Sequence, residues 1–133
     1  MPVLTQVYRA LCTHMAPMGL PLYLLECVPA DAEFPYITAR IAVPLAPHAA
    51  GSVTLTFWSL DGQPHSRRVF QADELLKLLP ARGFHLDTAA CTLTLRQEGG
   101  ALCIREGAAL GVRTVWKLRC FPAAKEVCHA SGL

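Results

Sequence analysis

Histidine and cysteine are among the residue types in this chain that could act as bases, nucleophiles or metal ligands. The 133 residues include five histidines and six cysteines. Histidine titrates near neutral pH and serves as a general base when a nucleophile or an orienting acid lies within hydrogen-bond reach. The five histidines lie in expected loops and element ends without such a partner set: His14, His48, His65, His85 and His129. We therefore expect surface histidines and no enzyme.

The cysteines fit no metal or disulfide pattern. No two of them have C-x-x-C spacing, and Cys128-His129 is the only directly adjacent cysteine–histidine pair. Because zinc needs three or four converging ligands, we expect no metal and no cofactor. The beginning of the chain has no pattern of an export signal, which favours reduced thiols that pack as small hydrophobes. Four of them lie in apolar, strand-like stretches: Cys27, Cys91, Cys103 and Cys120.

Basic residues alternate along the last expected strand. A net charge of +2 is too small to indicate a nucleic-acid binder by itself. Alternation nevertheless places the cations of residues 111–121 on one face of that strand. The candidate basic face comprises Arg113, Lys117 and Arg119, with Arg96 and Arg105 joining them if the register aligns the neighbouring strands. This face is either solvated or meets nucleic acid or an acidic protein.

Two further pairs of residues are candidate contact sites. Arg67 and Arg68 open an expected helix and either contact a phosphate or acidic partner or form a solvated pair, since cations oppose the dipole at a helix N-terminus. Trp58 and Tyr36 lie, with several threonines, on a strand face that helices would leave uncovered. Tryptophan is enriched at interfaces, and we expect a subunit interface there rather than plain solvent.

Two helices and six or seven strands are expected to position these residues. Apolar residues at three- and four-residue spacing predict helices over 3–15 and 67–79. Glu98-Gly99-Gly100 predicts a turn. Alternation of apolar and polar residues predicts strands, over 22–28, 36–43, 53–59, 90–97, 101–105 and 111–121, with an edge strand or turn at 83–86.

This order predicts an α+β fold, with an antiparallel or mixed β-sheet and two α-helices packed on one face. Residues 1–133 are expected to form a single domain, with 122–133 a loosely ordered tail. The composition, 53% hydrophobic and 17% charged, argues against disorder. The apolar runs are far shorter than the roughly 20 residues that span a bilayer, so we expect a cytoplasmic protein without membrane contact.

Two short sequence motifs, together with this order of elements, resemble those of a known protein family. Val7 to Leu11 (VYRAL) lies in the first helix, and Phe34 to Thr38 (FPYIT) enters the sheet. A strand ending in Trp58-Ser59, a second helix and a closing strand pair follow. Up to about Phe121, this arrangement resembles the tail-terminator proteins of long-tailed bacteriophages and prophages. These are minor tail proteins, also called tail-completion proteins.

The resemblance implies a structural role in the virion. Such proteins form a homo-oligomeric ring, commonly a hexamer, that caps the tail tube, stops its polymerisation and provides the head-joining surface. The implied partners are the tail tube protein and a neck or head-completion protein, with DNA passing through the lumen and assembly in the host cytoplasm. Arg113, Lys117 and Arg119 would line the lumen or meet the next subunit. The residues alone leave two alternatives: a small ligand-binding or enzymatic α+β domain, or an adaptor of another neck or secretion apparatus.

Overall fold

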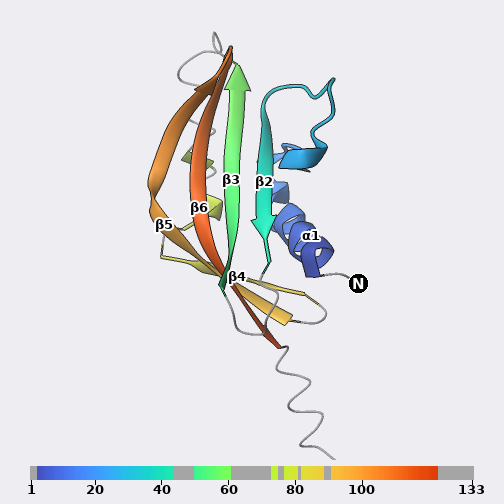
Figure 1. Cartoon of the computed structure of the whole chain (residues 1–133), viewed down its shortest axis with the longest axis vertical. Coiled ribbons are helices and arrows are strands. Elements are labelled where there is room, and N and C mark those ends of the chain that lie inside the picture. Colours follow the sequence, from blue (N-terminus) through green and yellow to red (C-terminus); the bar gives the residue numbers. More distant parts are fainter. Residues whose placement is uncertain are drawn as a thin grey trace, which may run out of the picture.

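One curled β-sheet organises the described part of the protein (Figure 1). The computed structural model describes residues 3–43, 50–60, 73–74, 77–80, 82–88 and 91–122. In chain order the elements are α1 (Val3–Met15), the 3-10 helix η1 (Ala16–Met18), β1 (Leu22–Leu24), the 3-10 helix η2 (Leu25–Cys27), β2 (Tyr36–Ala42), β3 (Ala50–Leu60), β4 (Phe84–Asp87), β5 (Cys91–Glu106) and β6 (Ala109–Pro122).

The six strands lie in the order β1-β2-β3-β6-β5-β4. All neighbouring pairs are antiparallel except β1 and β2, which run parallel. The short β1 and β4 therefore form the two edges of the sheet, and the long β3, β5 and β6 form most of its area.

α1 packs against one face of the sheet through an apolar stripe. Val7, Leu11 and Met15 recur at four-residue spacing and are at most 1% exposed. The helix contacts β1, β2 and β4, so the sheet curls around it. The Tyr8 hydroxyl donates a 2.7 Å hydrogen bond to the Leu22 carbonyl and fastens the helix to β1. We call the sheet face against α1 the helix-side face.

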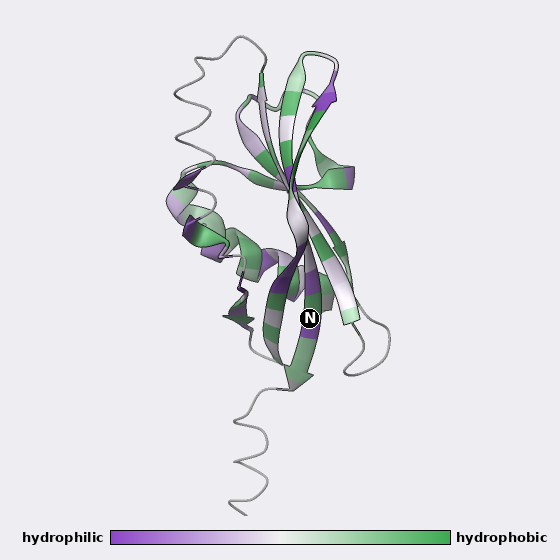
Figure 2. Ribbon diagram, turned by 90° about the vertical axis from the view of Figure 1, so that its left-hand side faces the viewer, coloured by the Kyte–Doolittle hydropathy of each residue, from purple (hydrophilic) through white to green (hydrophobic). Residues whose placement is uncertain are grey.

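The core lies between α1 and this face. Alternation along the strands is visible as bands of opposite hydropathy in Figure 2. Trp116 of β6 is fully buried and its ring meets Phe84 of β4 edge-on, with centroids 5.2 Å apart. The other sheet residues of the core are Leu22, Ile37, Ala39, Val53, Leu55, Phe57, Leu86, Leu93, Leu95 and Leu118.

The prediction of two helices packed on one face is wrong. The described residues form one mixed, curled six-stranded sheet with a single α-helix element, α1. Most of the predicted second helix, 67–79, lies outside the described residues. Leu79, within that range, is buried in the core. The described residues Asp73, Glu74, Lys77 and Leu78 of that range are helical, and Leu78 packs against the core beside Leu79.

The prediction of a turn at Glu98-Gly99-Gly100 is also wrong. β5 continues through this segment, and its register against β6 shifts there. Glu98 pairs with Val115 and Leu102 with Arg113, so β5 accommodates two extra residues as a bulge. Gly99 takes up the irregularity with a φ of 70°. The turn lies instead around Gly107, whose φ is 58°.

The expected strand over 22–28 is shorter than predicted. β1 ends at Leu24 and η2 follows directly. The two exposed cysteines, Cys27 and Cys103, do not pack as small hydrophobes as predicted, whereas Cys91 and Cys120 are half-buried. All five cysteines in the described part of the chain are free. Of the expected tail, 122–133, Pro122 is the last residue of β6, and residues 123–133 lie outside the described residues.

Candidate interaction surface

The second sheet face, opposite α1, is built from rows of side chains that cross the strands. We call it the open face, because no described α-helix lies on it. Each row follows from the register of β2, β3, β6 and β5. From one end of the strands to the other, the rows are Tyr36–Trp58–Gly111–Ile104, Thr38–Thr56–Arg113–Leu102, Arg40–Thr54–Val115–Glu98, Ala42–Ser52–Lys117–Arg96 and Ala50–Arg119–Thr94.

An aromatic cluster closes one end of the open face. Trp58 is 6% exposed, and its indole N–H donates a 2.9 Å hydrogen bond to the Thr38 hydroxyl. Tyr36 beside it is half-buried and contacts Tyr23 and Phe34, with ring centroids 5.7 and 4.8 Å away. Trp58 therefore packs within the sheet and offers a partner little area, while Tyr36 keeps part of its ring accessible.

A hollow of about 260 Å³ lies next to this cluster. Arg113 lines it together with Thr56 and Val115, and Glu106 is another of its lining residues. The Nε atom of Arg113 is buried and has no hydrogen-bond partner among the described residues. Burial, and then the charge of Glu106, raise the pKa of Tyr36 above its ordinary value of 10.0. The carboxylate of Glu106 therefore acts on the Tyr36 end of the face.

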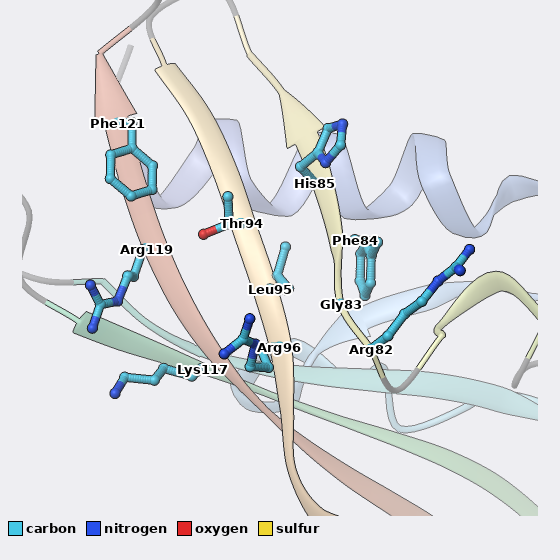
Figure 3. Close-up of a pocket in the computed structure, with 10 residues that line it drawn as sticks. All are labelled: Arg82, Gly83, Phe84, His85, Thr94, Leu95, Arg96, Lys117, Arg119 and Phe121. Atoms are coloured by element: carbon cyan, nitrogen blue, oxygen red, sulfur yellow. The ribbon is translucent and has the colours of Figure 1, made fainter.

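A larger hollow, of about 630 Å³, lies at the other end of the open face, over β4, β5 and β6. We call it the basic pocket. It is lined by Arg82, Gly83, Phe84, His85, Thr94, Leu95, Arg96, Lys117, Arg119 and Phe121. Figure 3 shows Arg96 between Arg82 on one side and Lys117 and Arg119 on the other, with α1 behind the strands. Four cations thus line one hollow, and none of its described lining residues is acidic.

The cations of the basic pocket lie close to one another and form no ion pair with the described residues. Arg96 and Lys117 are direct cross-strand partners, an arrangement that destabilises a sheet when both charges have the same sign. Arg82, Arg96, Lys117 and Arg119 form no ion pair with another described residue. A surface that concentrates unpaired like charges in a hollow is suited to an anionic partner.

The backbone of Gly83 shapes the wall of this pocket. Its φ is 111°, a conformation that side-chain-bearing residues rarely adopt. A Cβ at this position would lie 2.9 Å from the carbonyl oxygen of Leu95. Glycine therefore lets the chain before β4 approach β5 closely, and the adjacent Arg82 is held at the rim of the pocket.

The structure brings together only part of the predicted site. Lys117 and Arg119 line the basic pocket, joined by Arg96, whereas Arg113 lies in the smaller hollow. Arg105 pairs with Leu110 on the helix-side face, because the two-residue bulge preserves the alternation of β5. Arg67 and Arg68 lie outside the described residues.

Sequence reasoning missed Arg82 and His85 as members of the site. Their positions depend on β4 pairing with the start of β5, where His85 is opposite Thr94. The signal available in the sequence was weak, a short stretch after Pro80 that fitted an edge strand or a turn. His14, by contrast, stacks on Phe84 at 4.7 Å and hydrogen-bonds the Leu78 carbonyl, so it serves packing.

Within the described ranges, no group of three or more histidine, cysteine, aspartate or glutamate residues is placed to hold a metal ion. The same part of the chain contains no helix long and apolar enough to cross a membrane.

The fold is shared with solved structures. A chain of the virion of native gene transfer agent (GTA) particle matches 90% of this chain and 94% of its own length, with a TM-score of 0.59 and 15% identity. A second solved chain, whose name states no function, matches 92% of this chain and all of its own length, with a TM-score of 0.57 and 12% identity. No protein family and no curated protein matches the sequence. The likeness therefore establishes a common fold over nearly the whole chain.

Proposed function

We propose that this protein is a structural subunit of a phage-like particle and acts as a tail terminator. One observation carries the proposal: the end-to-end fold match with a chain of a gene transfer agent virion, which leaves little of either chain unmatched. The VYRAL and FPYIT motifs and the order of elements, which resemble tail-terminator proteins, support the same role. The protein would reside in the virion, after assembly in the host cytoplasm.

In this role the subunits close into a ring, a hexamer in the proposed form, on the last ring of the tail tube. The ring stops polymerisation of the tube and provides the surface for the neck or head-completion protein. The open face supports an interaction role, because it combines unpaired cations with partly accessible apolar side chains such as Leu102, which is 57% exposed. Arg113, Lys117 and Arg119 would face the lumen, through which DNA passes, or a neighbouring subunit.

The proposed role is not enzymatic. Among their described lining residues, neither hollow has a serine or cysteine, and His85 is the one histidine. The four cations that line the basic pocket suit the recognition of an anionic group.

Deletion of the gene in a host that produces the particles tests the proposed function. We expect tail tubes of uncontrolled length without attached heads, measured by negative-stain electron microscopy, and restoration of complete particles by a plasmid copy. Mass spectrometry of purified wild-type particles should detect the chain. Particles of normal tube length with attached heads from the deletion strain would contradict the proposal.

A further inference from the structure

Two distant regions of the molecule each concentrate charges of one sign. The first is the segment of residues 26–33, between β1 and β2, which we call the acidic segment. It carries Glu26, Asp31 and Glu33, all exposed, and no lysine, arginine or histidine. The second is the basic pocket, with four cations and no acid among its described lining. Each region has the charge that the other lacks.

The two regions lie at opposite edges of the sheet and at opposite ends of its strands. Asp31 and Glu33 come just before Tyr36, which lies in the same row as Trp58. Lys117 and Arg119 lie at the other end of the strands, where they pair with Ser52 and Ala50. In Figure 1 the loop before β2 is at the top, and β4 and the end of β6 are at the bottom.

The separation prevents the two regions from neutralising each other within one molecule. Tyr36 and Ala42, the two ends of β2, are about 20 Å apart at ~3.3 Å per residue. This exceeds the Debye length of about 10 Å at 0.1 M salt, so solvent-exposed charges at these ends are largely screened from each other. Asp31, Glu33 and the four pocket cations form no ion pair with another described residue.

We propose that the basic pocket receives the acidic segment of a second copy of this chain. The contact would join two different surfaces, the β4 edge of one copy and the β1 edge of the next, and is therefore heterologous. Heterologous contacts generate closed rings when the rotation between copies closes. This inference rests on the proposed function, because a ring requires a contact between subunits. The basic pocket and the acidic segment supply the residues of that contact.

A second copy explains both regions at once. Carboxylates are good partners for arginine, which binds them through paired hydrogen bonds. A nucleic-acid strand in the basic pocket would satisfy the cations but would leave Asp31 and Glu33 exposed and unpaired. A hollow of about 630 Å³ also suits a protruding loop, such as the one in which the Ala32 amide bonds the Pro29 carbonyl at 3.1 Å.

Mixing two charge-reversed variants of the full chain tests the proposal. The pocket variant is Arg96→Glu/Lys117→Glu, and the segment variant is Asp31→Lys/Glu33→Lys. Alone, each places like charges across the contact, which costs several kcal/mol, so self-association should weaken at least ~10-fold. Mixed in equal amounts, the variants should assemble again, because the acidic pocket of one meets the basic segment of the other.

Mass photometry and analytical ultracentrifugation at several salt concentrations measure these assemblies. Arg9→Glu/Arg105→Glu and Asp73→Lys/Glu74→Lys change the net charge equally outside the contact and should associate as the wild type does. Melting temperatures identify any variant that fails to fold, and single reversals at Arg96 and Asp31 then replace the double variants.

Three results would overturn the inference: a wild-type chain that stays monomeric at high concentration and low salt, separate variants that associate normally, or a mixture that does not assemble. Should the pocket variant associate normally but lose binding to a fluorescent DNA duplex, the pocket would belong to nucleic acid. None of these results decides the proposed function, because the presence of the chain in particles and the tube length of the deletion strain are measured independently.

Discussion

The two faces of the sheet use the same strands for different purposes. On β6, Trp116 and Leu118 face α1 and are fully buried, whereas the intervening Lys117 lies in the basic pocket. The helix-side face gains its stability from apolar area removed from water. The open face instead keeps the like-charged pair Arg96 and Lys117 side by side, which stability alone does not favour.

This difference separates buried residues that stabilise the fold from exposed cations for which we propose a role in contacts. The distinction does not follow the two faces strictly, because the tryptophan of each face donates a 2.9 Å hydrogen bond to a threonine: Trp116 to Thr114 and Trp58 to Thr38. The Trp58 end of the open face is thus packed like a core, although no described α-helix covers it. The open face is therefore divided into a packed end and a charged end.

Replacement of Trp116 should produce the largest effect on stability. We expect Trp116→Ala to lower the free energy of unfolding by about 3–5 kcal/mol, because a large buried ring is lost beside Phe84 and a cavity remains. Lys117→Ala, one residue along the same strand, should change it by less than about 1 kcal/mol. Urea unfolding followed by circular dichroism measures both. Equal losses would show that the two faces do not differ as described.

Gly111→Ala tests whether the Trp58 end of the open face is packed as tightly as a core. A Cβ there would lie 2.9 Å from Ile104 Cγ1 and 3.0 Å from both Thr56 Cγ2 and Trp58 Cζ3. We expect a loss of about 1–3 kcal/mol from overpacking. Gly100→Ala is the matched control, since a Cβ at Gly100 meets nothing within 4 Å. If Gly111→Ala changes the stability no more than Gly100→Ala does, the side chains around Gly111 can move aside and the Trp58 end is not packed like a core.

Much of the helix-side face could be predicted from the sequence. The four-residue spacing of Val7, Leu11 and Met15 and the alternation of β3 and β6 depend only on local geometry and on the need to bury apolar groups. The same alternation correctly placed Lys117 and Arg119 on one face. Local patterns of this kind survive folding, because each strand must present its apolar side to the core.

The basic pocket could not be predicted to the same degree, since it depends on pairing between distant segments. Arg82 and His85 join Arg119 only because β4 pairs with β5 and β5 with β6. Glu98-Gly99-Gly100 has the composition of a turn, yet the pairing with β6 on both sides of it keeps the chain extended. Tertiary pairing overrode the local turn preference, and with it the expected position of Arg105.

The smallest expected effect is a difference in thiol reactivity between the covered and the uncovered parts of the helix-side face. Cys120 and Cys103 both point to this face, but Cys120 is half-buried and Cys103 is exposed. Burial, and then the neighbouring Cys91, raise the pKa of Cys120 above its ordinary value of 9.0. Because the thiolate is the reactive form, iodoacetamide should modify Cys103 and the exposed Cys27 before Cys120, as measured by peptide mass spectrometry.

The raised pKa of Cys120 also predicts a dependence of stability on pH. Below pH 9 the thiol is protonated in both folded and unfolded chains, so its contribution is fully present. As the pH rises from 9 through the higher folded pKa, the unfolded chain loses its proton first, and stability falls. Cys120→Ala should remove this part of the alkaline decrease, whereas Cys103→Ala should leave it unchanged. A decrease of the same size in both variants would show that Cys120 is as accessible to water as Cys103, and that the covered part of the face does not extend to the end of β6.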